Sequence, residues 1–251
     1  MLRPVTGEVQ VARNATSSSL TSSSPKRRSR QNRRITRPAL QGCQTSGSRI
    51  DSLIRPTFSY TDFARQLALK PGATGAIAPS SKSLARKTIR QACLHDAKTV
   101  VELGPGTGVF TEEILHNLSC DQRFFAIELN QTFVAATKSR CPDVCVYHDA
   151  ASTLPVWLEK NNSTHADRII SSLPWTIFDK PEQDEMMQVI RDSLAPGGVF
   201  VSIIYLGAKF RARGRHFINN LQHHFSSVTY TPTVWHNLPP CLLYTSPSPR
   251  D

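Results

Sequence analysis

Three glycines at alternate positions follow an apolar run and an acid, a spacing suited to holding a small organic cofactor. Gly104, Gly106 and Gly108 come two, four and six residues after Glu102. Glycine lets the backbone turn tightly and lets a ligand approach where a β-carbon would collide with it. Residues 109–115 then have the apolar spacing of an amphipathic helix. The order of strand, turn and helix predicts that the cofactor lies at the turn.

The spacing of the glycines separates the candidate cofactors. The dinucleotide fingerprint is G-x-G-x-x-G, whereas this loop is G-x-G-x-G, and Pro105 removes an amide donor that a phosphate would use. A second acid, Glu128, ends the next apolar run, twenty residues beyond Gly108. An acid at that distance in α/β units binds ribose hydroxyl groups. The pattern therefore favours a cofactor that has a ribose but no pyrophosphate.

The elements that must position these residues alternate along the chain. Strands are predicted near 99–103, 124–128, 144–147, 167–171 and 198–205. Helices are predicted from Ser80 or Ser81 to about Ala92, near 109–117, 131–138 and 181–194, with a helical turn near 153–160. Alternation at this interval indicates an α/β fold with a parallel, doubly wound sheet, in which ligands bind beyond the carboxyl ends of the strands.

The glycine loop and the second acid together resemble motif I and the ribose-binding acid of class I S-adenosylmethionine-dependent methyltransferases. The resemblance implies a Rossmann-like, mostly parallel seven-stranded sheet with helices on both faces, and S-adenosylmethionine as the cofactor. It assigns to the cofactor site Glu102, Gly104, Gly106, Gly108, Glu128 and Leu129. It also implies that Asp149 binds the adenine amine and that Ala150 supplies a backbone amide. The alternative for Asp149 is an ordinary turn or helix-capping residue.

Four segments are similar to the bacterial phospholipid N-methyltransferases and their relatives, the rRNA adenine dimethylases. They are residues 73–81, 102–108, 172–175 and 233–240, and the resemblance covers about 57–240. It implies that the first segment closes over the cofactor, with Thr74 and Gly75 in the pocket.

In the rRNA adenine dimethylases, an amide side chain and an aromatic ring hold the adenine amine that is methylated. This chain has Ser172 and Trp175 at the equivalent positions. A serine cannot reproduce the amide geometry, so planar adenine is the weaker acceptor, whereas an indole suits a cationic head group. Ser172 is assigned to the cofactor site and Trp175 to the acceptor, with core packing as the alternative for Trp175. Tyr205, at the end of the fifth strand, is predicted to orient the acceptor amine.

The main functional hypothesis is an enzyme that methylates phosphatidylethanolamine at a membrane surface, toward phosphatidylcholine. A second is an RNA or protein N-methyltransferase, and a third is a cofactor-binding accessory factor without turnover. We expect a monomer that is peripheral to the cytoplasmic side of the inner membrane. The six cysteines form no C-x-x-C pair, so no metal site is expected.

Two terminal segments differ from the rest of the chain. Residues 1–50 contain ten Lys and Arg and one acid, so residues 51–251 keep only +2 of the net charge of +11. This Ser- and Arg-rich arm, 1–56, is predicted to be disordered. It is open to three interpretations: an organelle transit peptide, a polybasic arm for anionic lipid or nucleic acid, or sequence upstream of the true start.

Residues 241–251 resemble one reading frame of a transposase adapter used in shotgun sequencing. The methyltransferase domain is therefore expected to span 57–240. Its last strand, which in this fold class lies antiparallel between the fifth and sixth strands, is expected to be missing or replaced.

Overall fold

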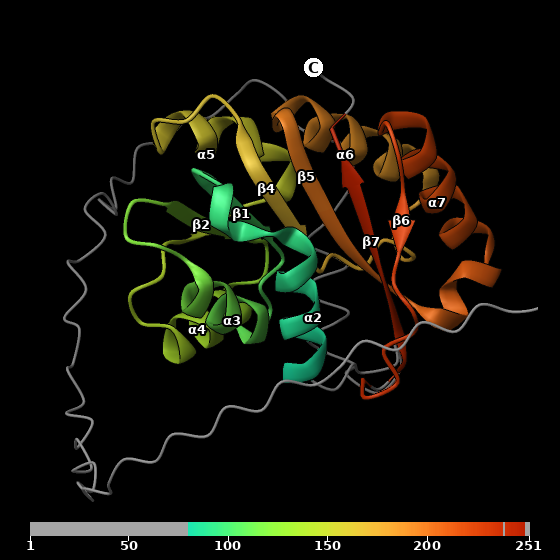
Figure 1. The fold of residues 1–251 in the computed structure, drawn as a ribbon, viewed down its shortest axis with the longest axis horizontal. Coiled ribbons are helices and arrows are strands. Elements are labelled where there is room, and N and C mark those ends of the chain that lie inside the picture. The colour runs from blue at the N-terminus through green and yellow to red at the C-terminus, as the bar shows by residue number, and fades with distance from the viewer. Residues whose placement is uncertain (1–79, 238, 249–251) are drawn as a thin grey trace, which may run out of the picture. The chain divides into compact units, whose positions relative to one another are not determined.

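The computed structural model describes residues 80–237 and 239–248, which form a seven-stranded sheet covered by helices on both faces (Figure 1). The strand order is β3-β2-β1-β4-β5-β7-β6. The first five strands are parallel to one another, and β7 is antiparallel to both of its neighbours. The strands are β1 (Thr99–Leu103), β2 (Arg123–Glu128), β3 (Val146–His148), β4 (Ala166–Ser171), β5 (Leu194–Tyr205), β6 (Thr229–Tyr230) and β7 (Cys241–Pro247).

Six α-helices and three short 3₁₀ helices accompany these strands in the described part of the chain. The α-helices are α2 (Lys82–Ala92), α3 (Val109–Asn117), α4 (Gln131–Arg140), α5 (Leu154–Lys160), α6 (Lys180–Ser193) and α7 (Ala212–His224). The 3₁₀ helices are η1 (Leu94–Asp96), η2 (Ala151–Thr153) and η3 (Leu206–Phe210). None of the described helices is both long and apolar enough to cross a bilayer.

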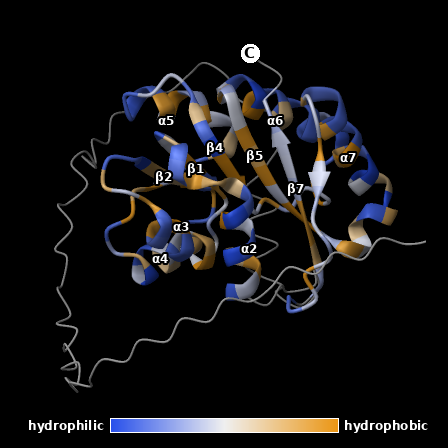
Figure 2. Cartoon of the chain, in the orientation of Figure 1, coloured by the Kyte–Doolittle hydropathy of each residue, from blue (hydrophilic) through white to orange (hydrophobic). Residues whose placement is uncertain are grey.

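The sheet has two apolar cores because its central strands are buried on both faces. Val101 on β1 and Ile169 on β4 pack with residues of α5, α6 and α7, whereas Val100 and Ile170 pack with residues of α2, α3 and α4. Neighbouring residues of a strand point to opposite faces, so a continuous apolar run fits a sheet covered on both sides. Figure 2 shows the hydrophobic residues concentrated along these strands.

The predicted strands and helices are found within a few residues of their expected bounds. β3 is shorter than the run that predicted it, and β6 had not been assigned as an element. The fold class is confirmed, including an antiparallel strand inserted next to β5. That strand, β7, consists of residues 241–247, which are the adapter-like segment and whose apolar residues complete the sheet. The expected arm and the boundary at residue 57 lie outside the described residues.

Candidate cofactor and acceptor site

The glycine loop has the backbone geometry that its sequence predicts. Gly104, Gly106 and Gly108 all have positive φ angles, of 75°, 59° and 78°. This left-handed region is costly for residues with a β-carbon, so each glycine is needed for conformational reasons. The loop is also held from α4: Thr137 Oγ1 donates to the Gly106 carbonyl at 2.8 Å, and Arg140 Nε donates to the Thr107 carbonyl at 2.7 Å. The two α4 residues that fix the loop were not predicted from the sequence.

Glu128, at the carboxyl end of β2, is fixed against the glycine loop. Its Oε2 accepts a hydrogen bond from the Gly106 amide at 3.1 Å, and its Oε1 accepts one from the Asn130 amide at 2.9 Å. Burial raises the pKa of this carboxyl, and the backbone hydrogen bonds oppose that rise. Each carboxylate oxygen has a second lone pair, so a pair of ribose hydroxyls can still bind. Asn130 also caps α4 through its side chain, which fixes the position of the carboxylate.

Glu102 lies inside the sheet rather than at its edge. The residue is fully buried on β1, and its Oε2 accepts a hydrogen bond from Thr111 Oγ1 of α3 at 2.6 Å. Its Oε1 accepts no hydrogen bond from any described residue. Burial raises the pKa of Glu102 from 4.5 to about 8, and the charge of Glu128 adds to the rise. An orphaned buried carboxyl oxygen is costly, and a cationic group of a ligand would satisfy it.

Asp149 follows β3 and is held on both of its carboxylate oxygens. Its Oδ1 accepts from the Ala150 amide at 2.8 Å, and its Oδ2 accepts from Trp157 Nε1 at 2.9 Å. The Asp149 amide itself donates to the Glu128 carbonyl at 3.0 Å, so the two acids lie side by side at the sheet edge. The Ala150 amide was predicted to face the cofactor; it is instead engaged by Asp149 and becomes available only if that side chain rotates. Beside Glu128, the Leu129 carbonyl lies 2.9 Å from His148 Nε2.

Trp157 on α5 is a positioning residue that the sequence did not reveal. Its ring stacks on Tyr147 with centroids 3.6 Å apart, and it donates to Asp149. We expect Trp157→Phe to keep the stack but to free the carboxylate. The loss of one hydrogen bond to a charged group should weaken S-adenosylmethionine binding by about 3–30-fold. Calorimetric titration with the cofactor measures this, and an unchanged affinity would mean that Trp157 has only a packing role.

Ser172 stands directly after β4 and supports the glycine loop. Its amide donates to the Leu103 carbonyl at 3.1 Å, and its hydroxyl donates to the Gly104 carbonyl. A β-carbon on Gly104 would approach Leu173 Cδ2 to 3.0 Å, so the loop and the residues after β4 are tightly packed. Ser172 therefore contributes to the site by holding the loop that the cofactor contacts.

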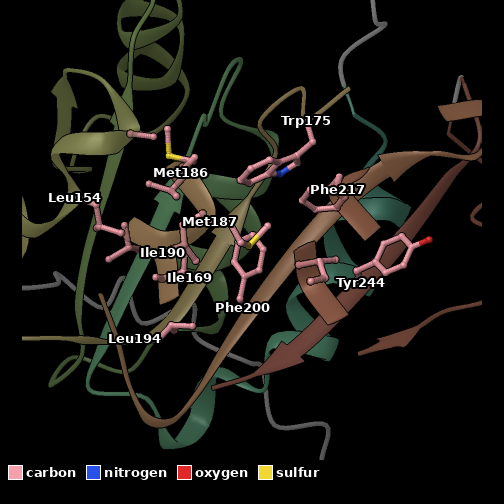
Figure 3. Close-up of a cluster of buried hydrophobic side chains, with 14 of the residues drawn as sticks. Leu154, Ile169, Trp175, Met186, Met187, Ile190, Leu194, Phe200, Phe217 and Tyr244 are labelled. Carbon is pink, nitrogen blue, oxygen red and sulfur yellow. The ribbon is translucent and has the colours of Figure 1, made fainter. Parts of the chain in front are cut away.

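The structure favours core packing for Trp175, the alternative to an acceptor role, because its indole is buried among apolar side chains. The residue is 1% exposed, and its Nε1 donates to Ser171 Oγ at 3.2 Å. The ring stacks on Phe217 of α7 with centroids 4.7 Å apart and meets the edge of Phe200. Figure 3 shows the indole among these side chains and the two methionines of α6. An enclosed indole presents no open face to a cationic head group.

A small cavity lies beside this segment, at the carboxyl ends of β4 and β5. It has a volume of about 50 Å³. Its lining includes Ser80, Leu84, Ser172, Leu173, Pro174, Trp175, Ile203 and Tyr205. Tyr205 is half-buried, and burial together with the nearby Cys241 thiol raises the pKa of its hydroxyl. The structure thus brings Tyr205 and Ser172 to one cavity.

These residues fit S-adenosylmethionine at three of its groups. Glu128 faces the glycine loop as a ribose ligand requires, Asp149 lies next to it for the adenine amine, and Glu102 offers an unsatisfied oxygen to a cation. Thr74 and Gly75 lie outside the described residues. Among the residues that the structure covers, no three His, Cys, Asp or Glu side chains gather as metal ligands would.

Comparison with known proteins agrees with this fold and with this cofactor. Residues 100–198 match a family model described as "Methyltransferase domain". The chain is 30% identical over 175 residues to an ornithine lipid N-methyltransferase of Singulisphaera acidiphila, covering 68% of this chain and 87% of that protein.

Two solved structures share the fold. The O-methyltransferase TomG of Streptomyces achromogenes, solved in complex with S-adenosylmethionine, superposes with a TM-score of 0.55 at 19% identity, covering 78% of this chain and 92% of that one. The N-methyltransferase NodS of Bradyrhizobium japonicum has a TM-score of 0.51 at 17% identity, over 67% and 96% of the two chains.

The sheet order, the glycine loop and the acid that ends β2 define a nucleoside-cofactor enzyme of the Rossmann-like class. Together with its sequence relative, they show that the chain belongs to the class I S-adenosylmethionine-dependent methyltransferases, and its cofactor is S-adenosylmethionine.

Proposed function

We propose that this enzyme methylates the amine of a membrane lipid head group, with phosphatidylethanolamine as the acceptor, on the way to phosphatidylcholine. The observation that carries the proposal is the similarity to a protein named for the N-methylation of ornithine lipid, over 87% of that protein's length. Because that name specifies another amine-bearing lipid, ornithine lipid is the second candidate acceptor.

The size and lining of the acceptor cavity support a small amine. A volume of about 50 Å³ suits a few non-hydrogen atoms, such as an ethanolamine head, better than a purine ring. The hydroxyl of Ser172 is engaged by the Gly104 carbonyl and cannot reproduce the amide pairing used for adenine. Both features favour a lipid amine over an adenine base.

The protein's contribution to methyl transfer is alignment and exclusion of water. The cofactor supplies an activated methyl group on its sulfonium, so the amine must present its lone pair along the carbon–sulfur axis. A lipid amine with a pKa near that of lysine, about 10, is protonated at neutral pH. The apolar side chains Leu173, Pro174 and Ile203 disfavour the charged amine and so promote loss of its proton.

Tyr205 orients the amine but does not act as its base. Because burial raises the pKa of its hydroxyl, the tyrosine keeps its proton near neutrality. Its oxygen can still accept a hydrogen bond from the amine. We expect Tyr205→Phe to lower kcat about tenfold while cofactor affinity is unchanged. Steady-state kinetics and cofactor titration test this, and equal losses in both would instead indicate a disturbed fold.

The proposed function is tested by transfer of labelled methyl groups from S-adenosylmethionine with the full chain. Vesicles containing phosphatidylethanolamine, vesicles containing ornithine lipid, and ribosomal RNA are offered in parallel. Label in phosphatidylethanolamine supports the proposal. Label in ornithine lipid alone keeps the lipid class but replaces the acceptor, and label in RNA alone overturns the proposal. Both lipid outcomes imply that the enzyme works at a membrane surface, as a peripheral protein.

A further inference from the structure

Two large aromatic side chains are exposed at the same edge of the sheet as the acceptor cavity. Phe210, at the end of η3, is 70% exposed, and Trp235, between β6 and β7, is 68% exposed. Burial is the usual state of such residues, and exposed aromatic side chains near a functional site often mark a contact surface.

Backbone contacts bring these two residues to that edge. η3 follows Tyr205 directly, and the Leu206 amide donates to the Pro240 carbonyl at 2.8 Å. The segment around Trp235 is also tied to α2, because the Asn237 side chain accepts from the Ser81 amide at 2.8 Å. Figure 1 shows η3, the β6–β7 connection and the start of α2 at one edge of the sheet. Ser80, next to that helix start, lines the acceptor cavity.

The surroundings of Phe210 are positively charged. Lys209 Nζ lies 5.0 Å from the centre of its ring, and Arg215 Nη1 donates to its carbonyl. Arg211 and Arg213 complete four cations within seven residues. The stretch 206–240 contains no Asp or Glu, and none of the four cations lies within salt-bridge distance of a described acid. Arg213 donates to the Ile177 carbonyl, and its charge is partly offset by Glu182.

We propose that Phe210, Trp235 and the cations at 209–215, here called the aromatic–basic edge, form a docking surface for an anionic phospholipid bilayer. Aromatic rings of this kind favour the membrane–water interface, and lysines and arginines beside them are attracted to anionic lipids. Docking at this edge directs the acceptor cavity toward the head groups. The proposal rests on the lipid acceptor proposed above and adds the surface that reaches it.

A bilayer fits this edge better than a nucleic acid does. Binding of single-stranded RNA requires rings spaced along a groove so that successive bases stack on them. Phe210 and Trp235 are instead carried by two separate connections and project from the surface. The membrane–water interface, unlike a nucleic acid strand, does not require a particular spacing between the aromatic rings that enter it.

Trp235 allows a direct test with the full chain. Trp175 is buried and Trp157 is half-buried, so Trp235 is the most exposed of the three tryptophans. Vesicles of phosphatidylglycerol and brominated phosphatidylcholine contain no amine acceptor, so binding is read independently of methyl transfer. We expect the vesicles to quench the emission of the wild type, and this quenching to be lost in Trp235→Phe. If the protein sediments with the vesicles but its tryptophan emission is not quenched, the proposal is overturned. Quenching of this emission by single-stranded RNA but not by vesicles would also overturn it.

A matched pair of variants tests Phe210. At about 0.5 M salt, where long-range attraction by the basic arm is screened, Phe210→Ser should lower vesicle affinity about tenfold. Tyr230→Ser is the control, because Tyr230 is 71% exposed but lies on β6, opposite Tyr244 within the sheet. Equal effects of the two variants would overturn the proposal. Methyl transfer to detergent-dispersed phosphatidylethanolamine should be the same in Phe210→Ser and wild type. This assay tests the proposed acceptor independently of docking on a bilayer.

Discussion

Replacing Glu128 with alanine should lower the affinity for S-adenosylmethionine by at least about 100-fold. The carboxylate is expected to accept both ribose hydroxyls, and hydrogen bonds to a charged group contribute about 1.5–3 kcal/mol each. The substitution also removes the acceptor for the Gly106 amide, so the glycine loop loses an anchor. Calorimetric titration of the purified variant with the cofactor measures the loss.

Glu128→Gln separates these two contributions. The amide keeps one carbonyl oxygen for a backbone donor but has no charge and only one acceptor atom. We expect it to bind the cofactor more tightly than the alanine variant and more weakly than the wild type. Circular dichroism and thermal unfolding would verify that both variants are folded. Wild-type affinity in Glu128→Ala would contradict the assignment of the ribose site.

Glu102→Gln should remove a pH dependence from the stability of the fold. Burial raises the pKa of Glu102 to about 8 in the native state, against 4.5 when exposed. Between these values the native state binds more protons than the unfolded state. The free energy of unfolding therefore falls as the pH rises from about 4.5 to about 8, by at most about 1.4 kcal/mol per pH unit. Glutamine has no proton to lose and does not contribute to this slope.

Urea unfolding at pH 5, 6, 7 and 8 tests this expectation. The glutamine variant should be close to wild type near pH 5 and more stable by about 2 kcal/mol or more at pH 8. Glu159→Gln is the control, because Glu159 is exposed on α5 and should not change the slope. Parallel pH profiles for wild type and Glu102→Gln would show that Glu102 is ionised in the native state.

The elements of the sheet could be predicted because their signals are local. Each run, such as Phe124–Ile127, is apolar over a few consecutive residues, and two-sided burial of a parallel strand requires that pattern. β6 was missed for the opposite reason. It has only two residues, so its position depends on the strand with which it pairs.

For Trp175, the spacing of residues along the chain does not predict whether the side chain faces the acceptor site or the core. Its place four residues after β4 is compatible with an acceptor site and with the core. The indole turns inward because Phe200 and Phe217, which are distant in the sequence, form a pocket for it. No local pattern encodes that pocket.

The sequence by itself determined the class of cofactor and the class of enzyme. The glycine spacing and the acid at the end of the next strand act through short-range backbone geometry, which a few consecutive residues specify. Only the tertiary structure decided the burial of Trp175, the pairing of Trp157 with Asp149, and the hydrogen bond from Leu206 to Pro240 that joins the connections carrying Phe210 and Trp235. These arrangements depend on contacts between distant segments, and such contacts exist only after the sheet has assembled.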